Sequence, residues 1–119
     1  MENISIVGSQ GYIGTVLCPE YNKKFSNIDS IKFLKEPENS KSNYWLNSII
    51  LKKPSIKNRD KIIQLAKENN IYLRPVWRPL HMLRPYKSMP SMPIKNADII
   101  YKSLINIPSS SFYFLKKKY

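Results

Sequence analysis

The chain has 119 residues, of which 42% are hydrophobic and 12% aromatic, so it is long enough for one folded domain and too apolar for a disordered chain. Lys and Arg outnumber Asp and Glu by 20 to 8, which gives a net charge of +12 at pH 7. Cys18 is the only cysteine; this excludes an internal disulfide and a cysteine-based zinc site, and we expect no metal. No apolar run approaches the roughly 20 residues of a membrane span and no signal-peptide pattern opens the chain, so we expect a cytoplasmic protein.

Residues 3–17, NISIVGSQGYIGTVL, contain all the glycines of the chain, Gly8, Gly11 and Gly14. Glycines at this spacing after a short β-type run allow a tight turn and close approach of the backbone to a phosphate. The stretch resembles the opening of the extended short-chain dehydrogenase/reductase family, which includes nucleotide-sugar epimerases and dehydratases. That resemblance implies a dinucleotide-binding turn at the three glycines.

The context of these glycines argues against a working cofactor site. Asp29 precedes a predicted strand instead of ending one, and Pro19 interrupts the first predicted helix, so we expect no NAD binding. The alternative is a strand and turn that keep their glycines without the cofactor. We therefore divide the chain into a glycine-rich segment, residues 1–18, and a domain over residues 19–119.

A helix and two strands follow in the first half of that domain. Tyr21, Phe25 and Ile28 recur at helical spacing, which predicts the end of a helix with these side chains on one face. Residues 31–34 predict a short strand. Residues 43–51, NYWLNSIIL, are rich in aromatic and branched side chains and predict a longer strand with alternate residues on opposite faces.

Two further helices are predicted in the second half. The first spans residues 58–69 with Asn58 as N-cap, and the second spans residues 96–104 with Asn96 as N-cap. A strand over residues 71–74 lies between them. The inward stripe of the first helix is expected to contain Ile62, Leu65 and Ala66. This order of strands and helices is typical of an α+β, two-layer fold.

Residues 74–86, RPVWRPLHMLRPY, form the most unusual stretch and carry the only histidine of the chain. Pro75, Pro79 and Pro85 each fix φ, remove a backbone N–H and push the preceding residue toward extended geometry. The stretch therefore predicts a rigid cationic loop, because neither a regular helix nor a central strand tolerates prolines at this density.

Three ordered blocks, residues 42–51, 59–87 and 96–110, carry a second resemblance. They resemble the C-terminal domain of the DegT/DnrJ/EryC1/StrS aminotransferases, pyridoxal-phosphate enzymes of fold type I that transfer an amino group to the keto sugar of a nucleotide sugar. The nearest branch resembles the one that makes legionaminic-acid and bacillosamine precursors, with perosamine synthases close to it. The resemblance implies a small, mostly antiparallel sheet with helices packed on one face.

In that family the proline-containing loop faces the substrate, which implies substrate-binding roles for Arg74, Trp77, Arg78 and His81. Arginines bind phosphate or carboxylate oxygens bidentately, the indole packs on a sugar or base, and the imidazole hydrogen-bonds a substrate oxygen. A purely structural His81 is the alternative. In the family the larger N-terminal domain carries the lysine that bonds to pyridoxal phosphate, and no lysine here matches that motif. We therefore nominate no catalytic residue and expect this chain alone not to bind the cofactor.

Three functions remain open. The first is a truncated or fused remnant of a sugar aminotransferase, inactive alone. The second is a binding module for a nucleotide sugar, or for a full-length aminotransferase or dehydratase. The third is a nucleic-acid binder, but the lysines are dispersed apart from the block at residues 116–118 and are not interleaved with aromatics, so only non-specific binding to polyanions is expected. An isolated domain of this kind also exposes an apolar patch, for which we expect contributions from Trp45, Trp77 or Met82 and self-association.

Overall fold

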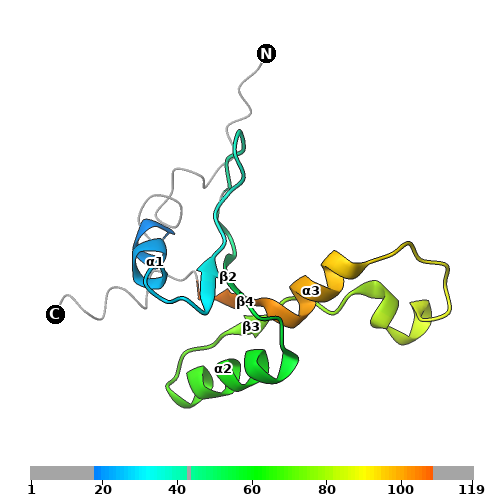
Figure 1. The fold of residues 1–119 in the computed structure, drawn as a ribbon. Helices are drawn as coiled ribbons and strands as arrows, with labels where there is room; N and C mark the ends of the chain where they lie inside the picture. The colour runs from blue at the N-terminus through cyan, green and yellow to red at the C-terminus, as the bar shows by residue number, and fades with distance from the viewer. Residues whose placement is uncertain (1–17, 43, 109–119) are drawn as a thin grey trace.

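The computed structural model describes residues 18–42 and 44–108, so the glycine-rich turn and the strand predicted before it lie outside the described residues (Figure 1). The helices and strands, in chain order, are α1 (Cys18–Phe25), β1 (Ile31–Phe33), β2 (Asn47–Leu51), α2 (Ile56–Glu68), β3 (Arg74–Pro75), α3 (Lys95–Ser103) and β4 (Leu104–Ile107). Two 3-10 turns, η2 (Leu80–Met82) and η3 (Arg84–Tyr86), lie between β3 and α3.

The four strands form one antiparallel sheet in the order β1-β2-β4-β3. Ile49 at its centre lies opposite Phe33 of β1 and Ile105 of β4. Directly opposed residues of an antiparallel sheet share a face, so one face of the sheet is apolar. The buried core consists of Phe33, Ile49, Leu51, Ile105 and Ile107.

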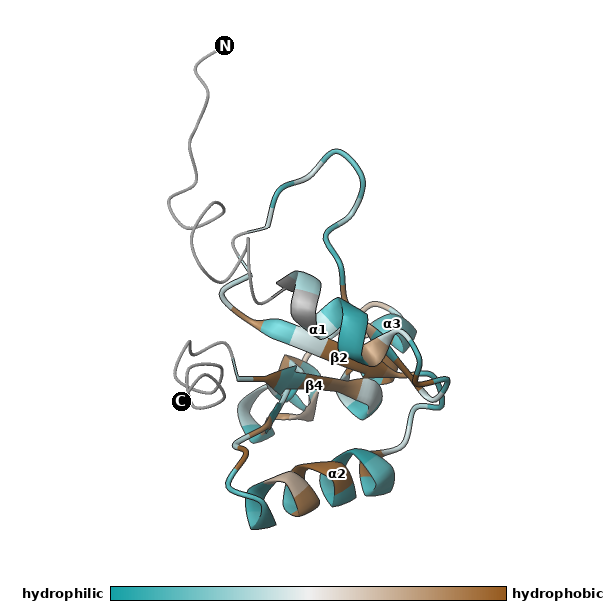
Figure 2. Cartoon of the chain, turned by 90° about the vertical axis from the view of Figure 1, so that its left-hand side faces the viewer, coloured by the Kyte–Doolittle hydropathy of each residue, from teal (hydrophilic) through white to brown (hydrophobic). Residues whose placement is uncertain are grey.

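Helices cover this apolar face. Tyr21 and Phe25 of α1 and Ile62 and Ile63 of α2 pack against the same buried cluster, which makes a second layer on the sheet. In Figure 2 the β2 and β4 ribbons are largely brown, the colour of hydrophobic residues, whereas the helix α2 alternates between hydrophilic and hydrophobic residues. α3 runs directly into β4 and contacts α2 and β2. The α+β fold class expected from the sequence, with an antiparallel sheet and helices, is confirmed.

The structure corrects the ends of several predicted elements. Residues 104–107 form the strand β4, although the sequence predicted a helix up to residue 104 and no strand after it. A four-residue strand that follows a helix without a loop has almost no local signal, and its pairing with β2 and β3 decides its conformation. The strand predicted from residue 43 begins at Asn47, because Tyr44 has a positive φ of 48° that breaks the extended chain.

The start and the inward face of α2 also differ from the prediction. The N-cap is Ser55, whose hydroxyl accepts a hydrogen bond from the backbone N–H of Asn58, and so Asn58 lies inside the helix. Leu65 was expected to face inward but is 49% exposed, whereas Arg59 is buried. The predicted stop is confirmed: Asn69 is the C-cap, and Asn70 has a left-handed φ of 60°.

Within residues 18–42 and 44–108, the buried amide of Asn47 makes no hydrogen bond. Asn47 is fully buried at the start of β2, on the apolar face opposite Ile107, and neither its amide oxygen nor its amide nitrogen makes a hydrogen bond. A buried amide without hydrogen bonds lowers the stability of the folded state, so Asn47 is a weak point of the core.

Candidate functional site

The predicted rigid loop lies between β3 and α3, and its backbone follows from its prolines. Pro79 precedes η2 and Pro85 lies within η3, so both short turns use residues whose φ is already fixed. Together with α3, the loop extends away from the sheet, on the right in Figure 1. The loop is thus held as a projection beside the helix instead of covering the core.

Arg74 and Trp77 lie at the beginning of this loop. Arg74 is in β3 opposite Asn106, on the sheet face that does not carry the core, and its side chain is exposed. On the same face the Ser48 hydroxyl donates a hydrogen bond to the amide oxygen of Asn106, at 2.7 Å. Trp77 is 74% exposed. Both predicted binding residues are therefore accessible to a ligand.

Arg78 and His81 approach α3. A side-chain hydrogen bond from Arg78 and a weaker one from Arg59 lower the pKa of the Tyr101 phenol from its ordinary value near 10, while burial acts in the opposite direction. His81 Nε2 lies 3.1 Å from Asp98 Oδ1, at ion-pair distance but without the alignment of a hydrogen bond. Asp98 and Tyr101 are three residues apart and so lie on the same side of the helix. Two of the four predicted residues are therefore brought together on α3.

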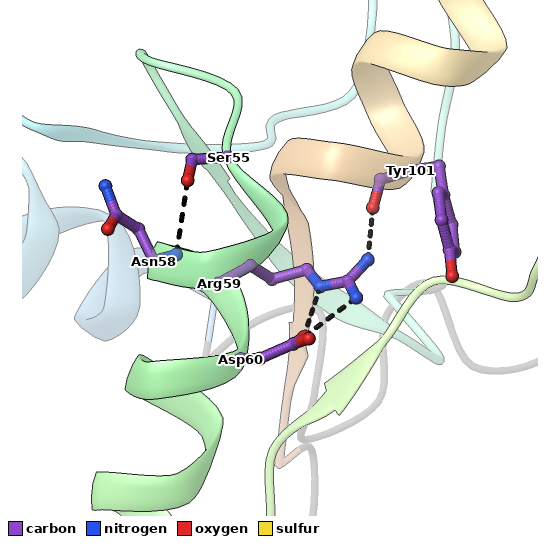
Figure 3. Close-up of polar contacts among 5 residues, drawn as sticks. All are labelled: Ser55, Asn58, Arg59, Asp60 and Tyr101. Carbon is purple, nitrogen blue, oxygen red and sulfur yellow. Dashed lines mark hydrogen bonds and ion pairs between the residues drawn. The ribbon is translucent and has the colours of Figure 1, made fainter.

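Arg59 joins α2 to α3 and was missed by the sequence reasoning (Figure 3). Its guanidinium donates a hydrogen bond to the backbone carbonyl oxygen of Tyr101 and lies 4.8 Å from the centre of the Tyr101 ring. Its Nε and Nη2 atoms are each 2.8 Å from Asp60 Oδ1. A signal existed in the sequence, because Arg59 precedes Ile62 and Ile63 by three and four residues and so shares their inward side.

The lysines are the residues to inspect for a bond to pyridoxal phosphate. A lysine that bonds to the cofactor has to lie in a cleft that excludes water, and every lysine in residues 18–42 and 44–108 is exposed. Within the same ranges, no group of three or more His, Cys, Asp and Glu residues is placed to hold a metal. In this described part of the chain, none of the helices has the length and apolar character to cross a membrane.

Two aminotransferases of known structure share this fold. The aminotransferase TlmJ from Streptoalloteichus hindustanus superposes with a TM-score of 0.65 at 18% sequence identity, over 77% of this chain and 24% of that chain. Spr1654 from Streptococcus pneumoniae, described as a sugar aminotransferase, superposes in both its PLP and PMP forms with a TM-score of 0.65 at 20% identity, over 79% of this chain and 24% of that one. The present chain thus corresponds to about a quarter of the length of these proteins.

A search of curated proteins finds no match. The model of one protein family matches residues 16–113, which is most of the sequence, and its description is the DegT/DnrJ/EryC1/StrS aminotransferase family. The matched range includes all the strands and helices described above. This chain belongs to the DegT/DnrJ/EryC1/StrS aminotransferase family.

Proposed function

We propose that the chain is a truncated or fused remnant of a pyridoxal-phosphate-dependent aminotransferase that acts on the keto sugar of a nucleotide sugar, and that it is inactive alone. Family membership and the likeness to sugar aminotransferases support the ancestry. The observation that carries the inactivity is the exposure of every described lysine, because none is enclosed as a cofactor-binding lysine has to be. The cytoplasmic location expected from the sequence stays a prediction.

The proposal also assigns a role to the loop. Arg74, Trp77, Arg78 and His81 form the rim of a substrate site that a larger domain would complete. The exposure of Arg74, Trp77 and Arg78 and the position of His81 beside Asp98 of α3 support this assignment. The dinucleotide-binding turn at Gly8, Gly11 and Gly14 stays a prediction, and with it the origin of residues 1–18 in a dehydrogenase-like sequence.

Two measurements on the purified full chain test the inactivity. The first is the visible absorption spectrum with pyridoxal phosphate, in which we expect only the bands of the free cofactor. The second is turnover with an amino donor and a keto-sugar nucleotide, which should equal that of the cofactor without protein. Turnover that disappears when one lysine is replaced by alanine would contradict the proposal, because that lysine would then be catalytic.

A binding module for a nucleotide sugar is the second candidate, and the 74% exposure of Trp77 beside exposed Arg74 and Arg78 favours it. Titration of the protein with a uridine diphosphate sugar should quench tryptophan fluorescence if the indole packs on the ligand. Trp77→Phe removes one of the two tryptophans and should abolish the quenching, whereas Trp45→Phe should keep it. An unchanged spectrum of the unaltered protein would exclude this function.

A further inference from the structure

A groove lies on the apolar side of the molecule, between α2 and the end of the sheet where β2 ends and β1 begins. It has a volume of about 670 Å³. Its apolar residues are Ile31 and Leu51 from the sheet and Ile62 and Leu65 from α2. The groove is therefore lined from both layers of the fold.

The groove is open because α2 packs mainly over the β3 and β4 side of the sheet and leaves the β1 end uncovered. The main contacts of α2 are with β3, β4 and α3, whereas α1 contacts β1 at the opposite edge. The helix residues in the groove, Asn58, Lys61, Ile62 and Leu65, follow the spacing of a single helical face. A helix normally buries the apolar part of such a face, yet Leu65 is 49% exposed. Of the predicted inward stripe, Ile62 packs against the core, whereas Leu65 stays half exposed.

The charges at the groove restrict the chemistry of an occupant. Lys52 and Lys53 follow β2 on one wall, and Lys61 lies on α2 on the other. Among the described residues of the lining, Asp29 is the only acidic one. At this groove, Lys52, Lys53 and Lys61 would repel another basic surface of a chain with a net charge of +12, so charge complementarity favours an acidic partner here, whatever association the exposed apolar residues of the loop cause.

We propose that this groove binds an acidic amphipathic helix of another protein. Such a helix would lay apolar residues at positions i, i+4 and i+7 on Leu51, Ile62 and Leu65, with carboxylates on both flanks near the lysines. The alternative occupant, an anionic amphiphile, carries its charge at one end, and its binding site would need lysines at only one end of the groove. Lysines on both walls match a helix with two acidic flanks. This inference does not depend on the proposed function.

The test measures binding of a fluorescent synthetic peptide by anisotropy, with the full chain as titrant. The peptide is a helix with leucines at i, i+4 and i+7 and glutamates on both flanks. Leu65→Ala should raise the Kd about tenfold, because the substitution removes apolar contact area. Lys52→Glu combined with Lys61→Glu should raise it by about tenfold as well, because two attractions become repulsions.

Matched controls separate the groove from the general basic charge. Lys67→Glu combined with Lys95→Glu makes the same change of net charge on exposed residues outside the groove, and should change the Kd by less than about twofold. A peptide of the same composition in scrambled order should bind at least about tenfold more weakly. Circular dichroism confirms that each variant is folded. The proposal would be overturned if the two peptides bound equally well, or if both double variants lost the same affinity for the peptide. Binding to phosphatidylglycerol vesicles without binding to the peptide would also overturn it.

Discussion

The central strands and the proline-containing loop are built on opposite principles. In β2 and β4 nearly every residue is buried, and their apolar side chains pack between helices and neighbouring strands. In residues 76–94 no residue is buried, and the shape is held by prolines, two 3-10 turns and contacts with α3. We therefore expect the strands, which hold the buried core, to contribute most of the folding free energy, while the loop presents the candidate binding groups Trp77, Arg78 and His81.

The strongest test of this comparison is Ile105→Ala. Ile105 is fully buried at the centre of the sheet, so the substitution leaves a cavity and should lower the free energy of unfolding by about 2–5 kcal/mol. Urea denaturation followed by circular dichroism measures it. Ile100→Ala on α3, where the side chain is 42% exposed, serves as control and should cost less than half as much. Equal effects would show that the strands do not dominate stability.

Arg59→Ala tests the junction between α2 and α3. The substitution removes the hydrogen bond to the Tyr101 carbonyl oxygen and the contact with its ring, and should lower the free energy of unfolding by about 2 kcal/mol. Arg59→Lys should recover only part of the loss, since an ammonium group cannot repeat the planar arrangement of donors. The measurement is the same denaturation curve, and a full recovery with lysine would refute the role of the guanidinium geometry.

Asn47→Leu should increase stability. The side chain of Asn47 is fully buried without a hydrogen bond, and leucine has a similar branched shape without unsatisfied polar atoms. We expect a gain of about 1 kcal/mol in the free energy of unfolding. A loss of stability would indicate that the amide binds a buried water molecule in solution.

Leu80→Ser tests whether an exposed side chain of the loop contributes to stability. Leu80 is 66% exposed in η2, so its substitution should change the free energy of unfolding by no more than about 0.5 kcal/mol. The same change should reduce self-association, because Leu80, Trp77 and Met92 all expose large apolar side chains in this region. Sedimentation velocity of the variant and of the unaltered protein measures the association. A monomeric unaltered protein at high concentration would contradict the predicted apolar patch.

The smallest expected effect concerns the ionisation of Tyr101. Arg78 lowers the pKa of the phenol in the folded state, so the phenolate is favoured by folding. This contribution to stability is complete above pH 10 and is lost as the pH falls through the folded-state pKa. Arg78→Gln should return the pKa of Tyr101 toward 10. The check is an ultraviolet titration of tyrosinate, with Tyr101→Phe subtracted to isolate one of the eight tyrosines.

Local sequence features were sufficient to predict those elements whose conformation is specified by their own residues. The periodic residues of α2, the Asn69–Asn70 stop, the branched residues of β2 and the prolines of the loop each act within a few positions, so their effects are visible without the rest of the chain. The family resemblance through residues 59–87 and 96–110 also depends only on the order of residues, and the family match confirms it.

Other features were decided by tertiary contacts. β4 is a strand because β2 and β3 pair with it on both sides. Leu65 is exposed because α2 packs mainly against β3, β4 and α3. Arg59 is buried because α3 supplies a carbonyl oxygen and an aromatic ring to it from 42 residues away. The pairing of His81 with Asp98 likewise joins residues whose separation gives no local signal. The sequence by itself determined which of these segments are helical, extended or rigid. Only the packing of the segments decided which polar groups meet and which apolar surface stays open. The reason is that such contacts depend on the positions of elements that are distant in the sequence.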